Sequence, residues 1–144
     1  MIFCDTSTLA KYYAPEREST EVRLRFDRED QVVFSELARV ELMAVFHRRL
    51  RERKWTRKEF LTVLQQFTRD DADCYWRWLP LESAILEQAT KIFSTLSEKI
   101  FLRSSDCLHL VTAVHYQMHE IYTHDTHQFE AASSFGIVAV RIGF

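Results

Sequence analysis

The sequence predicts an α/β domain in which short parallel strands alternate with helices, and three observations support this. The 144 residues are 47% hydrophobic and 28% charged, a balance typical of one globular domain (residues 1–144) rather than of a disordered chain. Short apolar segments alternate with segments of helical apolar spacing, which favours parallel strand pairing. Only two glycines are present, at positions 136 and 143. This scarcity disfavours an all-β sandwich and excludes a glycine-rich phosphate-binding loop.

The first half of the chain is expected to contain two strands and four helices. Proline disfavours the helical conformation in the residue before it, so Pro15 should end the first helix near Ala14. Residues 31–34 are mostly β-branched or aromatic, which predicts a strand. Thr56 is a candidate N-cap, and Glu59 would complete its capping box. The expected elements are strands at 2–4 and 31–34 and helices at 7–14, 19–26, 35–54 and 56–71.

The second half repeats the alternation of strands and helices. Residues 75–79 are predicted to form a strand that ends at Pro80. Apolar spacing then predicts helices at 83–96 and 105–118, followed by a strand at 121–123, a short helix at 126–134 and a last strand at 137–140. The sequence therefore predicts about five strands flanked by helices.

Cysteine content, charge and hydropathy exclude several classes of protein. Cys4, Cys74 and Cys107 are too few and too widely spaced for a disulfide framework or a thiolate zinc site. The N-terminus lacks the features of a signal peptide, and no apolar run is long enough to span a bilayer, so we expect a cytoplasmic protein without a membrane partner. The net charge of −2 gives no global sign of nucleic-acid binding.

Two aspartates follow predicted strands directly. Asp5 comes after the first strand and Asp125 after the fourth, so both belong at the edge of the sheet where α/β proteins bind ligands. Each also has a simple structural explanation, because aspartate is a favoured N-cap, and Gln128 would complete a capping box with Asp125. Taken alone, either aspartate is best interpreted as a cap.

Two further acids lie on predicted helices. Glu41 has apolar neighbours three and four positions away, so its carboxylate should face the interior, where an unpaired charge is costly. An ion pair with Arg39 or Arg103 would explain it equally well. Asp106 opens a helix, where the helix dipole favours an acid.

The four acids indicate a shared function if the fold brings them together. Two unit charges about 4 Å apart repel by roughly 4 kcal/mol at an effective dielectric constant of 20. Protonation or bound divalent cations must then relieve the repulsion. Ligands that are all oxygen favour Mg²⁺ or Mn²⁺ over zinc, and such a site suits phosphoryl chemistry.

The four acids lie in segments that together resemble a known family, and the similarity covers essentially the whole chain. The segments are Ile2-Phe3-Cys4-Asp5-Thr6-Ser7, Ser35-Glu36-Leu37-Ala38-Arg39-Val40-Glu41, Arg103-Ser104-Ser105-Asp106-Cys107-Leu108-His109 and Tyr122-Thr123-His124-Asp125. In this order and at these separations they resemble the PIN domain, and within it the VapC-like ribonuclease toxins of bacterial type II toxin–antitoxin pairs. The resemblance implies a three-layer sandwich with a central parallel sheet of about five strands.

The resemblance also implies a site and an activity. Asp5, Glu41, Asp106 and Asp125 match the metal-binding acids of the family, with Asp5 and Asp106 the strongest candidates for direct ligands. Ser7 and Thr123 match its supporting polar positions. The implied reaction is Mg²⁺-dependent hydrolysis of an RNA phosphodiester by a metal-activated water, with Mn²⁺ a plausible substitute. The implied partners are a VapB-like antitoxin, an RNA substrate such as a loop of tRNA or rRNA, and a second copy of the chain in a homodimer.

The sequence leaves other interpretations open. The chain could be a PIN-like binding module that holds a partner or DNA with little turnover. Seven of the nineteen Lys and Arg residues fall between positions 48 and 58, where they could contact RNA phosphates or simply form a solvated helix end. Trp55 could stack on a base. His109 is expected to have a structural or supporting role, and His115 and His119 to lie at the surface.

Overall fold

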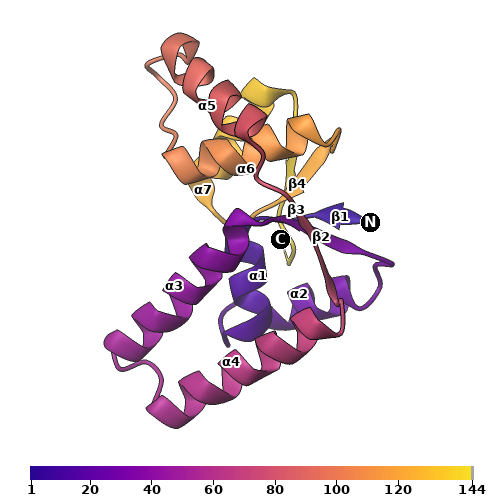
Figure 1. Cartoon of the computed structure of the whole chain (residues 1–144), viewed down its shortest axis with the longest axis vertical. Coiled ribbons are helices and arrows are strands. Elements are labelled where there is room, and N and C mark those ends of the chain that lie inside the picture. The colour runs from indigo at the N-terminus through magenta and orange to yellow at the C-terminus, as the bar shows by residue number, and fades with distance from the viewer. Residues whose placement is uncertain (144) are drawn as a thin grey trace.

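The computed structural model describes residues 1–143, and their five strands and seven α-helices follow the predicted alternation (Figure 1). All observed strand pairs are parallel. The strand β1 pairs with β2, and β2 with β3, while β4 pairs with β5. A parallel bridge between Cys4 and Tyr122 joins the two groups, giving the order β3-β2-β1-β4-β5. The bounds are β1 Ile2–Phe3, α1 Thr6–Tyr13, α2 Ser19–Phe26, β2 Val32–Ser35, α3 Leu37–Arg51, α4 Arg57–Ala72, β3 Trp76–Leu79, α5 Ser83–Thr95, α6 Ser104–His115, β4 Glu120–Tyr122, α7 Thr126–Ala131 and β5 Val138–Val140.

The helices form a layer on each face of the sheet, so the predicted three-layer sandwich is confirmed. Figure 1 shows α1 to α4 on one side of the strands and α5 to α7 on the other. Alternate strand residues supply the two cores because successive side chains point to opposite faces. Ile2 and Phe34 belong to the core of the α1–α4 side. Phe3 and Val33 belong to the core beneath α6 and α7.

Most of the predicted elements lie within a few residues of their observed positions. The Thr56–Glu59 capping box is present, and Ala14 ends α1 with an extended conformation before Pro15. The helix α3 is shorter than predicted because the chain turns at Arg53, which has a positive φ of 57°. The helix α6 ends at His115 because Gln117 turns similarly, at φ 58°. The predicted helix 126–134 is α7 followed by a 3₁₀ turn at Ala132–Phe135.

This strand order places a change of direction between β1 and β4. The chain moves from β1 toward β3 on one side and continues through β4 to β5 on the other. In open α/β sheets, ligands bind beyond the carboxyl ends of the strands at such a point. Asp5 follows β1 and Asp125 follows β4, so both lie beside it. Within residues 1–143, no helix is both long and apolar enough to cross a membrane.

Candidate functional site

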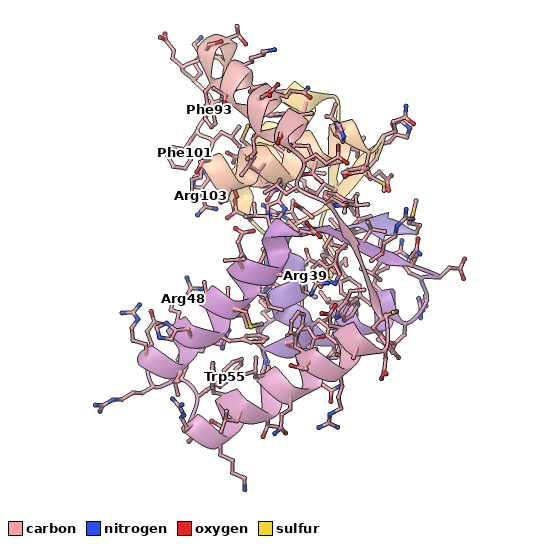
Figure 2. All side chains as sticks on the ribbon, in the orientation of Figure 1. Arg39, Arg48, Trp55, Phe93, Phe101 and Arg103 are labelled. Carbon is pink, nitrogen blue, oxygen red and sulfur yellow. The ribbon has the colours of Figure 1, made fainter. Side chains whose placement is uncertain are left out.

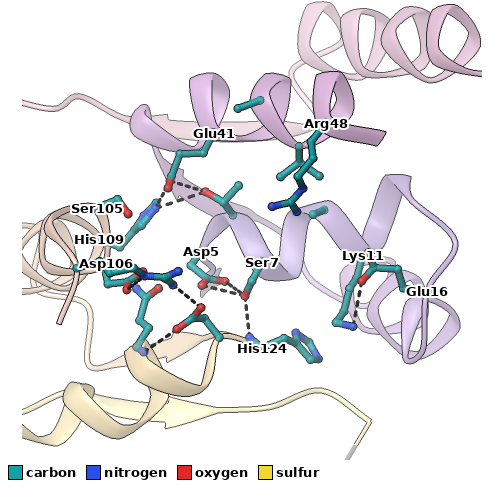
Figure 3. Close-up of a pocket in the computed structure, with 17 residues that line it drawn as sticks. Asp5, Ser7, Lys11, Glu16, Glu41, Arg48, Ser105, Asp106, His109 and His124 are labelled. Carbon is teal, nitrogen blue, oxygen red and sulfur yellow. Dashed lines mark hydrogen bonds and ion pairs between the residues drawn. The ribbon is translucent and has the colours of Figure 1, made fainter. Parts of the chain in front are cut away.

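A cavity of about 480 Å³ opens at the carboxyl ends of β1 and β4, and all four acids singled out from the sequence line it. They reach it from four separate segments: the end of β1, the second turn of α3, the first turn of α6 and the N-cap of α7. Figure 3 shows the side chain of Glu41 directed from α3 toward His109, with Asp5 and Asp106 farther from α3. The fold therefore collects the four carboxylates, which are Asp5, Glu41, Asp106 and Asp125.

Asp5 is fixed by neutral donors on both sides. Ser7 Oγ lies 2.7 and 2.9 Å from its two carboxylate oxygens, and Thr123 Oγ1 donates to Oδ2 at 2.7 Å. The backbone N–H of Thr8 donates to Oδ1 at 3.1 Å, so Asp5 is also the N-cap of α1. Burial raises the pKa of Asp5, although the charge of His109 and these hydrogen bonds act in the opposite direction. The carboxylate is thus held in one orientation without a strong ion pair.

Glu41 is tied to two other elements. Thr6 Oγ1 donates to Glu41 Oε1 at 2.7 Å, and His109 Nε2 lies 2.5 Å from the same oxygen. Burial alone would raise the pKa of Glu41, but the hydrogen bond and charge of His109 outweigh it and lower the pKa. The same pair raises the pKa of the buried His109 against its own burial. The ion-pair partner of Glu41 is therefore His109, and the suggested pairing with Arg39 or Arg103 was wrong.

Arg103 bridges the other two acids. Its Nε donates to Asp106 Oδ2 at 2.8 Å, and its Nη2 donates to Asp125 Oδ2 at 2.5 Å. Asp125 Oδ1 accepts the backbone N–H of Gln128 at 2.9 Å, so Asp125 caps α7 as expected. The Arg103 side chain itself is 51% exposed. One guanidinium on the surface side of the cavity therefore pairs with two carboxylates and offsets one of their two negative charges.

The donor chemistry of the cavity fits Mg²⁺ or Mn²⁺, because four carboxylates and nearby hydroxyls are hard oxygen ligands. Within residues 1–143, however, no three Asp, Glu, His or Cys side chains lie close enough together to hold a metal ion. The bridge from Arg103 explains part of this spacing, because the guanidinium stands between Asp106 and Asp125, where a cation would reduce their repulsion. The residues therefore match a metal site in the chemistry of their donor atoms, but the described side chains are not spaced as a formed metal site.

Several contacts around the acids were not recognised from the sequence. Neither the hydroxyl of Thr6 nor the bridging role of Arg103 was anticipated, although the three-residue spacing from Arg103 to Asp106 on a helix allowed such a pair. His109 was expected to support the site, and it does contact Glu41. The hydroxyls of Ser7 and Thr123 both contact Asp5, and they lie 3.4 Å from each other.

Other features that the sequence suggested lie outside the cavity. Trp55 is buried between α3 and α4 against Phe46, so it cannot stack on a base, and that suggestion was wrong (Figure 2). His115 pairs with Glu82 at 3.3 Å and belongs to no metal cluster within the described chain.

The comparison with family models decides the relationship. The model of the PIN domain matches residues 2–133. The chain belongs to the PIN-domain family. No curated protein matches the sequence significantly.

Several solved structures have a similar fold. The Mycobacterium tuberculosis toxin VapC20, described as cleaving the sarcin–ricin loop, matches with a TM-score of 0.74 and 16% identity over 98% of this chain and 99% of that one. FitAcB from Neisseria gonorrhoeae matches with a TM-score of 0.72 and 20% identity, over 96% of both chains. VapBC2 from Rickettsia felis, bound to a DNA fragment from its promoter, matches with a TM-score of 0.65 and 13% identity, over 98% of both chains.

Proposed function

We propose that this PIN-domain protein is a Mg²⁺-dependent endoribonuclease that hydrolyses RNA phosphodiester bonds as the toxin of a type II toxin–antitoxin pair. The observation that carries the proposal is the meeting of four carboxylates from four segments in one cavity at the strand ends. A cluster of this kind has few uses other than binding cations. Membership of the PIN family and the similarity of the fold to VapC20 support the same activity.

Within this proposal, Asp5 and Asp106 are the direct metal ligands, and Glu41 and Asp125 ligate directly, act through water or help to hold a second metal. When bound, Mg²⁺, or Mn²⁺ in its place, activates a water molecule and stabilises the leaving oxygen. Ser7 and Thr123 orient Asp5 through the hydrogen bonds described above. His109 and Thr6 keep Glu41 turned toward the cavity.

Arg103 must move for the metal to reach Asp106 and Asp125. Its half-exposed side chain can swing into solvent, whereas Asp106 is nearly buried and stays in place. A guanidinium turned away from the two carboxylates would be free to contact the phosphate backbone, for which its planar fork is well suited.

The partners follow from the same proposal. The toxin acts in the cytoplasm on a single-stranded RNA loop, for example in tRNA or rRNA, because loops expose readable bases. A VapB-like antitoxin blocks the cavity, and two copies of the chain form a homodimer. The similarity of the fold to VapBC2, which is bound to DNA from its promoter, and to a toxin–antitoxin complex from Klebsiella pneumoniae supports an antitoxin as partner.

The test is RNA cleavage by the purified protein. Total bacterial RNA and a sarcin–ricin loop hairpin are incubated with Mg²⁺, with Mn²⁺ or with EDTA, and the new RNA ends are sequenced. The proposal predicts cleavage that depends on the metal and is lost in Asp106→Asn. Cleavage by Asp106→Asn at the rate of the parent would show that the assigned mechanism is wrong.

A binding module is the second candidate, and the Arg103 bridge favours it, because two of the four acids are already paired with an arginine. In that case the cavity binds no Mn²⁺, and the chain holds its antitoxin tightly without cutting RNA. Calorimetry with Mn²⁺ and with the protein encoded beside this gene separates the two candidates, since only the nuclease needs the metal.

A further inference from the structure

We propose that Arg48 binds a phosphate of the RNA strand next to the bond that is cut, so that the substrate lies along α3. The inference rests on the proposed function and adds the path of the substrate to it. The sequence alone could not show which of the seven Lys and Arg residues between positions 48 and 58 contact RNA and which are only solvated. The structure separates Arg48 from the others by its place at the cavity.

Arg48 is the uncompensated cation of the cavity. Three Lys or Arg residues line it: Lys11, Arg48 and Arg103. Lys11 pairs with Glu16 at 3.4 Å and Glu18 at 3.1 Å, and Arg103 pairs with the two aspartates. Arg48 is exposed, and it forms no ion pair or side-chain hydrogen bond with any residue that the structure describes. Its guanidinium is therefore available to pair with an anionic ligand from outside the protein.

The helix α3 sets the distance between this charge and the acids. Glu41, Ala44, Val45 and Arg48 all line the cavity, as expected for positions on one face of a helix. Seven positions correspond to a rise of about 10 Å along the axis, so Arg48 stands two turns from Glu41. Figure 3 shows Arg48 descending from α3 toward α1, on the side of Glu41 away from Ser105 and His109.

The surface between the two residues suits an extended strand. Ala44 and Val45 are small and carry no charge, so nothing on this stretch of α3 repels a phosphate backbone. Figure 2 shows Arg48 and Arg103 on the same side of the molecule. A strand that has its cleaved phosphate at the acids can therefore place a neighbouring phosphate at Arg48.

The neighbouring basic residues have other roles. Arg49 forms an ion pair with Glu16 and lies over the ring of Trp55, 5.4 Å from its centroid. Lys54 pairs with Glu52 at 3.3 Å. Arg53 is exposed at the turn after α3, forms no ion pair within the described chain and does not line the cavity. It therefore provides a matched control with the same charge and exposure.

RNA suits this arrangement better than an acidic peptide does. Both could pair with a guanidinium, but RNA carries a phosphate at every nucleotide, so one end of the strand can meet the metal site while the next phosphates meet Arg48. The guanidinium fork can also donate two parallel hydrogen bonds to a single phosphate. We therefore assign the contact to RNA.

The experiment measures binding without cleavage. A 5′-labelled single-stranded RNA oligonucleotide is titrated with the parent, Arg48→Gln and Arg53→Gln in EDTA, and fluorescence anisotropy is recorded at about 50 and 200 mM salt. Arg48→Gln should bind several-fold more weakly at low salt. Its slope of log affinity against log salt should be about 0.7 smaller, so its deficit shrinks about 2.5-fold at the higher salt. Arg53→Gln should match the parent.

The inference would be overturned by equal affinities and slopes for the parent and Arg48→Gln, by an equal loss in Arg53→Gln, or by a parent that does not bind the RNA. A loss of binding to polyglutamate but not to RNA would also overturn it and would identify Arg48 as a peptide contact. Thermal unfolding checks that both variants fold. Because this binding assay contains no metal, it is independent of catalysis: absence of cleavage in the separate assay with Mg²⁺ would contradict the proposed nuclease and leave the binding result standing on its own.

Discussion

Asp70 in α4 and Asp106 in α6 are both nearly buried carboxylates, 7% and 5% exposed, yet they are held in different ways. Asp70 accepts hydrogen bonds from the hydroxyl of Tyr13 at 2.6 Å and from the amide of Gln66 at 2.7 Å. Tyr13 in turn accepts from the indole of Trp76 at 2.8 Å. These partners are neutral, and they lie on elements packed around the core of the α1–α4 side.

Asp106 instead faces a cavity and depends on a charged partner. Arg103 holds it from the solvent side, and three other carboxylates line the same space. A network of neutral donors held by packing stabilises the fold, because moving any one of them would leave a buried polar group without a hydrogen-bond partner. A half-exposed guanidinium can be replaced by another cation. The comparison therefore separates a structural acid from one available for chemistry.

Asp106→Asn should produce the largest effect on activity. We expect metal-dependent RNA cleavage to fall by at least about 100-fold, because loss of a residue that merely supports a metal ligand already costs 10- to 100-fold. The free energy of unfolding should change little, since the amide can still accept a hydrogen bond from Arg103. Cleavage rates and urea unfolding are measured on the same preparation.

Asp70→Ala should have the opposite profile. It leaves the Tyr13 hydroxyl and the Gln66 amide without their acceptor, and each buried donor left unpaired costs about 1–3 kcal/mol. We expect the free energy of unfolding to fall by about 2 kcal/mol or more, with cleavage by the folded fraction unchanged. If this variant lost cleavage while still folded, the two networks would not be separate.

Tyr13→Phe tests the same network with a smaller change. The ring still packs between Phe46 and Phe67, but the hydroxyl that joins Trp76 to Asp70 is removed. The free energy of unfolding should fall by about 1 kcal/mol. Equal stability of Tyr13→Phe and the parent in urea would indicate that the hydroxyl contributes nothing net.

Arg103→Gln should have the smallest effect on stability, and it should act specifically on Mn²⁺ binding. Without the guanidinium, the carboxylates of Asp106 and Asp125 repel each other, so the metal-free protein should melt at a slightly lower temperature. Mn²⁺ should then bind about three- to tenfold more tightly, because it no longer competes with a protein cation, and it should raise the melting temperature more than it does in the parent. Weaker Mn²⁺ binding in this variant would contradict a competing role for Arg103.

The sequence predicted the order of elements well because local signals carried it. Pro15, the Thr56 cap and the β-branched residues 31–34 act on their immediate neighbours, and the structure confirms all three. The ends of α3 and α6 were misjudged because Arg53 and Gln117 adopt positive φ values, which residues other than glycine rarely do.

Pairing between distant side chains was harder to predict. The four acids were found because they lie at strand ends or on an apolar helix face, yet the partners of Glu41 depend on how α6 packs beside α1 and α3. His109 is 68 positions away from Glu41, and no local pattern connects them. Asp70 was not noticed at all, because its partner Tyr13 is 57 positions away.

Binding of Mn²⁺, followed by the loss of the electron paramagnetic resonance signal of the free ion, tests the central claim most directly. The parent and Asp70→Asn should bind the ion alike, and Asp106→Asn should bind it at least about tenfold more weakly. A parent that leaves the free-ion signal unchanged, or equal binding by Asp106→Asn, would contradict the assignment of the cavity as a metal site.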